Sequence, residues 1–501
     1  MIEREKLLLG AALVAALLAS TACGGGGSGG GASIASTSGS TSASATGASS
    51  TSSTSSTTAS STATSASTTA ADSNLSLPAQ VGQKAFFDKN LSGGKNMSCA
   101  SCHDPQYAYG PPNSFSVQLG SDPTQSGVRA VPSLRYRDST PPYDDNAANP
   151  DGVTSNSPGG GFMWDGRAPT LAAQAALPLL NPVEMNNASK EAVVQAIQSG
   201  AYADLFRQAF GANVFDSTDT AFNALGTAIQ ALETEDLSFH PYSSKYDLYV
   251  FNKIGGTLTA AEQRGEVVFH STGVANCSGC HYTGANFNGS TGLMTDFTYQ
   301  TLGAPRNDSS IPNNPDPIPA NVQPSYFDLG LCGPYRTDHM PATPDTPDAY
   351  CGMFKVPVLR NVATRGSFFH NGVFHSLEQV LNFYNTRDTN PEYWYPAASG
   401  ATGTPQANPS WALQPTYVPG ATVNKYNDLP ASQQGNLDEE LPLGTGNGGD
   451  KTLASGTQPR QPGSTPVMTQ QQIADLVCFL GTFTDGYQPP AQAPVDGKCV
   501  N

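Results

Sequence analysis

Basic residues are scarce in this chain of 501 residues, in which 24 Lys and Arg stand against 40 Asp and Glu and give a formal net charge of −16. Proteins that hold the phosphates of nucleic acid need the opposite sign, so nucleic acid is excluded as an expected partner. A basic protein that docks on an acidic face is still allowed. A sustained β-rich pattern is lacking as well, so we expect a mainly α fold with long loops.

The N-terminus has an apolar run, residues 7–19, that is too short to span a bilayer comfortably. It follows a short charged start and ends in Ser-Thr-Ala-Cys, which predicts a signal peptide over residues 1–22. The small residues before Cys23 resemble a bacterial lipoprotein cleavage site, so we expect Cys23 to be lipidated. The alternative is ordinary signal cleavage with an incidental cysteine. The expected location is the periplasm, with the membrane reached only through the lipid anchor.

The next segment lacks almost everything that makes a core. Residues 24–71 consist of Gly, Ser, Thr and Ala with the single exception of Ile34. Such a composition cannot bury enough apolar surface to fold. We therefore predict a disordered tether over residues 24–72, with the folded part of the protein beyond it.

Two CxxCH motifs follow, CASCH at residues 99–103 and CSGCH at residues 277–281. A thioredoxin-type redox pair needs a strand–helix context that neither motif has. A zinc site needs further ligands nearby, whereas these motifs lie 178 residues apart. Haem attachment needs only two thiols for the vinyl groups and an axial imidazole. The motifs therefore predict two covalently bound haem c groups held by Cys99, Cys102, His103, Cys277, Cys280 and His281, with the two histidines as proximal iron ligands.

Four cysteines remain once the signal and haem motifs are assigned, an even number in an exported chain. This favours disulfides over free buried thiols. Proximity along the sequence suggests the pairs Cys332–Cys351 and Cys478–Cys499.

Helix signals precede both haem motifs. A short helix with proline in its first turn is expected over 78–90, and a capping box, Thr259 to Glu262, opens a helix that leads to the second motif. The order helix, CxxCH, loop thus occurs twice. It predicts two cytochrome-c-like haem domains packed against each other, at 73–255 and at 256–501.

Further helix signals occur within these two predicted domains. Helical patterns are expected at 189–210 and 219–235, and capping boxes at Ser376 to Gln379 and at Thr469 to Gln472. Residues 386–468 are rich in Pro, Gly and Asn and are expected to be a loop-rich insertion.

Two longer stretches, FMWDGRAPTLAAQAALPLLNPVEM at 162–185 and FKVPVLRNVATRGSFFHNGVFHSLEQVLNFYN at 354–385, resemble the bacterial di-haem cytochrome c peroxidase and MauG superfamily. The resemblance extends over about residues 78–485. It implies that Glu184 is the distal carboxylate of a peroxide-binding first haem, able to move a proton between peroxide oxygens. It implies also that Gln174 orients this carboxylate, that Pro178 lines the pocket, and that Trp164 lies between the haems.

The chain departs from the family pattern at two places. The loop after His103 contains no histidine that could close the first iron, which favours an iron open to peroxide. Where family members hold calcium with an asparagine and backbone carbonyls, this chain has Ala130, Arg365 and Ser367. Calcium is therefore not expected, and the Arg365 guanidinium is a candidate for the missing positive charge.

The resemblance also selects a branch of the superfamily. Tyr384 shares a helix face with Leu377, Val380 and Leu381 and matches the distal ligand of the second haem. Cytochrome-oxidising members have methionine there, whereas the MauG-like branch has tyrosine. Met340 and Met353 are less favoured substitutes, since both lie earlier in the chain.

These features predict a di-haem peroxidase that uses hydrogen peroxide at the first haem, stores or relays oxidising equivalents at the second, and oxidises a periplasmic partner protein. One alternative is a cytochrome c peroxidase that reduces peroxide with electrons from a small cytochrome or cupredoxin. Another is a non-enzymatic di-haem electron-transfer protein.

Overall fold

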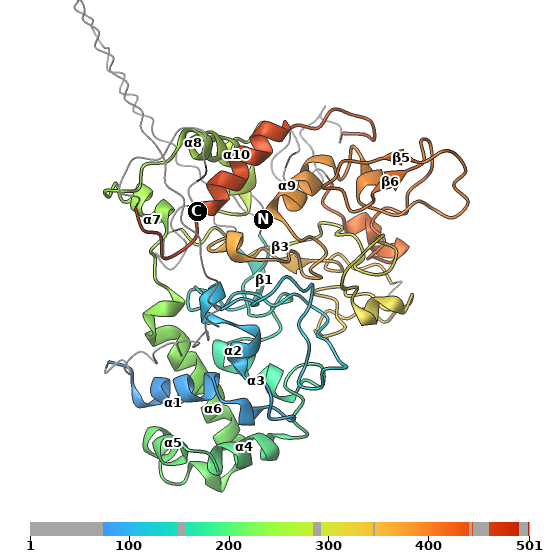
Figure 1. Ribbon diagram of the computed structural model, residues 1–501. Coiled ribbons are helices and arrows are strands. Elements are labelled where there is room, and N and C mark those ends of the chain that lie inside the picture. Colours follow the sequence, from blue (N-terminus) through green and yellow to red (C-terminus); the bar gives the residue numbers. More distant parts are fainter. Residues whose placement is uncertain are drawn as a thin grey trace, which may run out of the picture. The chain divides into compact units, whose positions relative to one another are not determined.

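The computed structural model describes residues 74–148, 156–283, 292–343, 346–439, 443, 460–489 and 499, all of which belong to one compact unit, Ala70–Asn501. The predicted signal peptide, Cys23 and the predicted tether lie outside these residues. The α-helices are α1 Leu77–Phe86, α2 Cys99–Cys102, α3 Leu171–Leu180, α4 Lys190–Gln198, α5 Ala203–Phe210, α6 Thr218–Glu235, α7 Lys245–Val250, α8 Ala260–His270, α9 Leu377–Thr386 and α10 Gln470–Gly481 (Figure 1).

The N-terminal helices pack around α6, which contacts α1, α3 and α4 (Figure 1). The apolar stripe expected on α6 is buried, with Phe222, Leu225, Ile229 and Leu232 all less than one tenth exposed. Helix α1 crosses α6 at Gly82, where a Cβ atom would collide with the backbone carbonyl of Ala228. This close approach requires glycine. The helix starts at the predicted place, with Ser76 Oγ accepting from Ala79 N at 3.3 Å.

Two helix predictions in this region need correction. The helix expected over 189–210 is two helices, α4 and α5, because the chain turns at Ser199 and Gly200. Ser199 Oγ donates to Gln195 O at 2.7 Å, and Gly200 N donates to Ile197 O at 3.0 Å, which tightens the last turn. The helix expected over 78–90 ends at Phe86 and is followed by a separate 3₁₀ turn, Lys89–Leu91.

A second hydrophobic cluster is built on α8, α9 and α10. Helix α8 crosses α10 at Gly265, which faces the carbonyl of Asp475 just as Gly82 faces that of Ala228. The predicted capping box is present: Thr259 Oγ1 accepts from Glu262 N at 3.2 Å, and Glu262 Oε2 accepts from Thr259 N at 2.6 Å.

The other two capping boxes differ in their outcome. The box at Thr469 and Gln472 is formed in full. At Ser376 the prediction is only half right, since the side chain caps the helix but Gln379 Oε1 accepts from His375 N at 2.8 Å instead of from Ser376.

Helix α7 lies inside the first predicted domain, 73–255, but packs on the second cluster. The ring of Tyr246 lies 5.0 Å from that of Phe483 and 5.7 Å from that of Phe479, centroid to centroid. Helix α7 therefore belongs to the second hydrophobic cluster, and the segment that packs around α6 ends before α7 begins.

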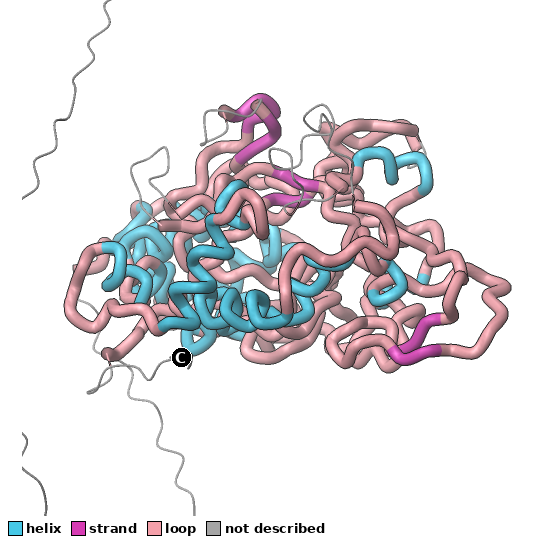
Figure 2. The backbone as a smooth tube through the Cα atoms, turned by 90° about the horizontal axis from the view of Figure 1, so that it is seen from above, coloured by secondary structure: helices cyan, strands magenta, loops and turns pink. Residues whose placement is uncertain are grey.

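Strands are short and occur in pairs. Three two-stranded antiparallel sheets occur in the described residues, formed by β1 Asp144–Ala147 with β2 Ser157–Gly159, β3 Tyr299–Gln300 with β4 Phe354–Lys355, and β5 Gln406–Ala407 with β6 Thr416–Tyr417. Figure 2 shows that loops make up most of the remaining chain. The predicted mainly α fold with long loops is confirmed.

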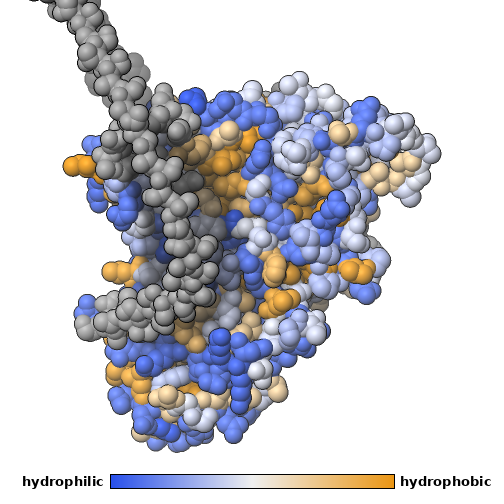
Figure 3. Space-filling view, in the orientation of Figure 1, coloured by the Kyte–Doolittle hydropathy of each residue, from blue (hydrophilic) through white to orange (hydrophobic). Residues whose placement is uncertain are grey.

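The helices of the described residues do not meet the requirements for crossing a membrane, since none of them has the length and apolar character needed. Figure 3 shows polar side chains over most of the visible face, with apolar residues in separate patches.

Candidate functional site

The first CxxCH motif forms the short helix α2, and Ser101 Oγ accepts from Ser98 N at 3.0 Å at its start. His103 ends this helix, and its Nδ1 donates to the carbonyl of Tyr109 at 3.0 Å. This hydrogen bond fixes the ring and its tautomer and leaves Nε2 as the nitrogen that can bind a metal. Burial lowers the pKa of His103 to about 4, so the imidazole is neutral, as a metal ligand must be.

The second motif repeats this arrangement on a 3₁₀ turn, Cys277–Gly279. His281 Nδ1 donates to the carbonyl of Met294 at 2.9 Å, and burial again lowers the pKa of the imidazole to about 4. Both histidines are thus held by a backbone carbonyl in the manner of oriented metal ligands.

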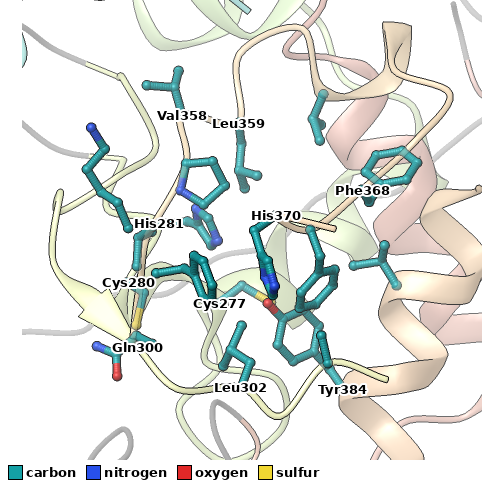
Figure 4. Close-up of a pocket in the computed structure, with 18 of the residues that line it drawn as sticks. Cys277, Cys280, His281, Gln300, Leu302, Val358, Leu359, Phe368, His370 and Tyr384 are labelled. Atoms are coloured by element: carbon teal, nitrogen blue, oxygen red, sulfur yellow. The ribbon is translucent and has the colours of Figure 1, made fainter. Parts of the chain in front are cut away.

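A cavity of about 200 Å³ opens beside the second motif. Figure 4 shows Cys277, Cys280, His281, His370 and Tyr384 around it. The predicted stripe of α9 faces this space, since Leu377, Val380, Leu381 and Tyr384 all line it.

Tyr384 is the member of that stripe with chemistry of its own. Burial raises the pKa of its phenol above the usual value, and the charges of Cys280 and Cys277 act in the same direction. An anionic tyrosine oxygen therefore needs a cation beside it in this place.

Methionine sulfur is the competing ligand type. Met340 is half exposed and, like Met353, is not among the residues that line the cavity. Met468 does line it and is buried, although the sequence reasoning did not consider it. Met468 lies 84 positions beyond Tyr384 in the chain, so no local pattern links it to the motif.

Trp164 lines this cavity and also a smaller one of about 40 Å³. Its indole Nε1 donates to Ala130 O at 2.8 Å, and its own carbonyl accepts from Lys355 N at 2.9 Å. Gln174 lines the smaller cavity with it. The indole is therefore held in place beside both cavities.

Glu184 follows α3, and the structure brings its carboxylate near Cys102, whose pKa it raises. Burial raises the pKa of Glu184 itself, and its Oε2 has no hydrogen-bond partner among the described residues. A buried carboxyl with a vacant oxygen is suited to exchanging protons with a small molecule. Glu184 is not among the residues that line the smaller cavity with Gln174.

Pro178 lies inside α3, and its carbonyl accepts from Asn181 N at 3.3 Å and from Met185 N at 3.1 Å. The turn that carries Glu184 is held in this way. Asp165 accepts from Arg167 Nη1 at 2.9 Å and from Arg129 Nη1 at 2.8 Å, so this carboxylate stabilises the turn after Trp164.

Three of the cations that line the larger cavity are the buried Lys355 and the partly buried Arg137 and Arg365. Each donates to a backbone carbonyl: Arg137 Nε to Ser133 O at 2.8 Å, Arg365 Nε to Ser367 O at 3.3 Å, and Lys355 Nζ to Gly161 O. Within the described residues, none forms an ion pair with a carboxylate.

Burial lowers the pKa of Arg137 and of Arg365 to about 10 and that of Lys355 further below its usual value, and the charge of Arg137 lowers the last two as well. Glu233 acts on Arg137 and Asp165 on Lys355 only at longer range than an ion pair. Cations desolvated without a carboxylate in contact are costly, so this cluster indicates an anionic group that belongs in the cavity. The sequence reasoning missed Arg137 and Lys355, although a lone lysine within FKVPVL is a signal that could have been noticed.

These residues fit haem c at both places. Each motif offers two cysteine thiols and a neutral histidine with Nε2 left over, and CxxCH binds haem in this way. The carboxylates of haem propionates are the anions that the cluster of Arg137, Lys355 and Arg365 lacks.

The remaining cysteines are paired as disulfides, Cys332–Cys351 and Cys478–Cys499. His370 lines the larger cavity and stacks on Phe354 at 3.5 Å between ring centroids. Its Nε2 is 3.8 Å from Asp428 Oδ2, beyond hydrogen-bond distance.

A fold of helices and long loops with two CxxCH motifs is that of a di-haem c-type protein, and comparison with known proteins gives the family. The sequence model of the di-haem cytochrome c peroxidases matches residues 78–254. The methylamine utilization protein MauG of Paracoccus denitrificans is 33% identical over 313 residues, which cover 61% of this chain and 74% of that protein.

Cytochrome c551 peroxidase of Pseudomonas aeruginosa is 28% identical over 303 residues, covering 60% of this chain and 70% of that protein. The crystal structure of the di-haem peroxidase BthA from Burkholderia thailandensis superposes with a TM-score of 0.62 at 32% identity, covering 82% of this chain and 86% of that one. This chain belongs to the di-haem cytochrome c peroxidase family, and it is an oxidoreductase of the peroxidase class.

Proposed function

We propose that this protein reduces hydrogen peroxide at the first haem, stores or relays the oxidising equivalents at the second, and uses them to oxidise a partner protein. The observation that carries this proposal is Tyr384, which lines the cavity of the second motif where a cytochrome-oxidising enzyme would present methionine. Bound in these pockets, the haems would supply the redox-active iron. The relative named MauG is a methylamine utilization protein, and its likeness supports this branch without naming a partner here.

The residues of this chain would divide the remaining work. Glu184, buried and with Oε2 vacant, would take a proton from one peroxide oxygen and return it to the other. Trp164, which lines both described cavities, would pass electrons between the two haems. Arg137, Lys355 and Arg365 would hold the propionates and so fix both porphyrins about this indole.

A second candidate function has its own support. Met468 lines the same cavity, and a sulfur ligand there would suit a cytochrome c peroxidase fed by a small cytochrome or cupredoxin. Stopped-flow mixing of the purified holoprotein with peroxide, followed by reduced cytochrome c, separates the two. We expect rapid bleaching of the haem spectrum by peroxide and slow turnover of cytochrome c, whereas fast turnover favours the second candidate.

We further propose that the protein works without calcium. The carbonyl of Ser367, which the resemblance puts at a calcium ligand position, accepts from Arg365 Nε, and Ala130 O accepts from Trp164 Nε1. The positively charged guanidinium of Arg365 thus occupies the position that a calcium ion would take beside the Ser367 carbonyl. Incubation with a chelator should leave the haem spectra and the peroxide reaction unchanged; a calcium-dependent spectral change would contradict this.

The proposed location is the periplasm, with a lipid anchor on Cys23. The two disulfides and two haem-attachment motifs support export, since both chemistries belong outside the cytoplasm. Cys23→Ser should move the protein from the membrane fraction to the soluble fraction with its peroxide reaction intact. A wild-type protein that is already soluble would rule out the anchor.

A further inference from the structure

A group of aromatic rings extends from Tyr384 away from the second pocket. The ring of Tyr384 lies 6.1 Å from that of Phe383 and 5.9 Å from that of Phe369, centroid to centroid. Phe383 lies in turn 5.5 Å from Trp394, with the two ring planes nearly perpendicular. One phenyl ring therefore separates the tyrosine in the cavity from a buried indole.

Trp394 continues the series toward the surface. It is fully buried, and it stacks on Trp411 at 5.6 Å between centroids with an interplanar angle of 23°. Tyr393 contacts Trp411 edge-on at 5.5 Å. Both Trp411 and Tyr393 are partly exposed, so the series of rings begins at the cavity and ends at solvent.

The outer rings are held in place by the backbone of the insertion. Trp411 lies in the loop between β5 and β6. Gln414 N donates to Tyr393 O at 2.9 Å, and Asn408 Nδ2 donates to Glu392 O at 3.0 Å. These bonds join the hairpin loop to the segment that carries Tyr393 and Trp394.

We propose that Trp394 and Trp411 form an electron path by which the second pocket draws electrons from a redox partner that contacts the surface at Trp411. This inference rests on the proposed function and extends it, because it names the place where the partner's electrons enter. Indoles are the most easily oxidised side chains after thiols and phenolates, and transfer through rings in contact is faster than through the same length of aliphatic chain.

The electron balance is simple. Peroxide takes two electrons and two protons and leaves as two waters. Each electron passes from the partner to Trp411, from Trp411 to Trp394, and from there through the phenyl ring to the second pocket. Trp394 keeps its proton, because Nε1 donates to Thr386 Oγ1 at 2.9 Å while that hydroxyl donates to Asn382 O at 2.7 Å.

The test exposes the holoprotein to excess peroxide without a donor and maps oxidised side chains by mass spectrometry of its peptides. We expect oxidation to concentrate on Trp411 and Tyr393, and Trp394→Phe to lower it there several-fold. Tyr249, which is exposed and lies outside this series, serves as the control site. Equal oxidation of Tyr249 and Trp411, or an unchanged pattern in Trp394→Phe, would overturn the path.

Two variants of Trp411 separate the loss of an oxidisable ring from a structural change at the surface. Trp411→Tyr keeps an oxidisable ring whereas Trp411→Phe does not, so only the second should lengthen the life of the peroxide-oxidised spectrum. Equal lifetimes for the two variants would overturn the path. A protein whose spectrum does not respond to peroxide at all would overturn the proposed function and the path together, whereas a normal response with an unchanged oxidation pattern would overturn only the path.

Discussion

The two CxxCH pockets are alike on one side and different on the other. In each, a helix crosses another at a glycine, Gly82 or Gly265, and the motif histidine donates Nδ1–H to a backbone carbonyl. Beside the first motif lies Glu184, whose buried Oε2 has no hydrogen-bond partner among the described residues, whereas the cavity at the second motif is lined by Tyr384. A proton-exchanging group and a ligand-forming group suit different tasks, so a duplicated scaffold can divide peroxide chemistry from storage of its oxidising power.

The strongest way to break this contrast is to remove the acid of the first pocket. Glu184→Gln should slow the reaction with peroxide by about 10²–10⁴-fold, the usual contribution of general acid–base assistance, with haem content unchanged. Stopped-flow absorbance measures the rate. Glu233→Gln is the matched control, since Glu233 is also a buried carboxyl near a motif cysteine, with a pKa raised by burial to about 8.

The same variant predicts a pH profile. Proton abstraction needs the Glu184 carboxylate, so the rate should rise with pH through its pKa, which burial places above the usual range of a glutamate. This limb should be absent in Glu184→Gln. A rate that is independent of pH in the wild type, or an unaltered profile in the variant, removes Glu184 from the proposed role.

Substitution of Arg365 tests whether its positive charge stabilises the haem propionates. Arg365→Met leaves buried propionates short of a counter-charge, and we expect the holoprotein to lose about 3 kcal/mol of stability, as for one partner removed from a buried ion pair. Both haem potentials should fall, because less positive charge favours the ferric state. Arg365→Lys retains the charge and should show a smaller loss; equal melting curves for all three proteins would contradict the assignment.

The second pocket is tested by giving it the ligand of the cytochrome-oxidising branch. Tyr384→Met should raise the potential of one haem on the order of 0.1 V, a fraction of the roughly 0.8 V over which axial ligands act. Spectroelectrochemical titration measures it. Met468→Leu discriminates between the two candidate ligands: if it changes that haem's spectrum while Tyr384→Met does not, sulfur is the native ligand.

The smallest expected effect concerns the scaffold that both pockets share. Thr259→Ala removes the cap of α8, whose Glu262 also accepts from the buried Lys245 Nζ at 2.6 Å. We expect a loss of about 1 kcal/mol by thermal unfolding, typical of an N-cap. Ser76→Ala on α1 is the counterpart in the first half and should cost a similar amount if the two scaffolds are equivalent.

The sequence by itself determined the features that depend on neighbours in the chain. The CxxCH spacing predicts haem attachment, and the caps at Thr259 and Thr469 are formed as expected, because a side chain reaching a backbone group three residues away needs no tertiary partner. The stripe of α9 could likewise be assigned to an inward face, since helical periodicity fixes which residues share a side.

Tertiary structure alone decided what depends on distant segments meeting. Arg137, Lys355 and Arg365 are separated by up to 228 positions, and nothing local shows that all three line one cavity. The placement of α7 on the second core, the entry of Met468 into the pocket and the stacking of Trp394 on Trp411 are of the same kind. Burial and contact are sums over the whole fold, whereas a motif records only the local part of them.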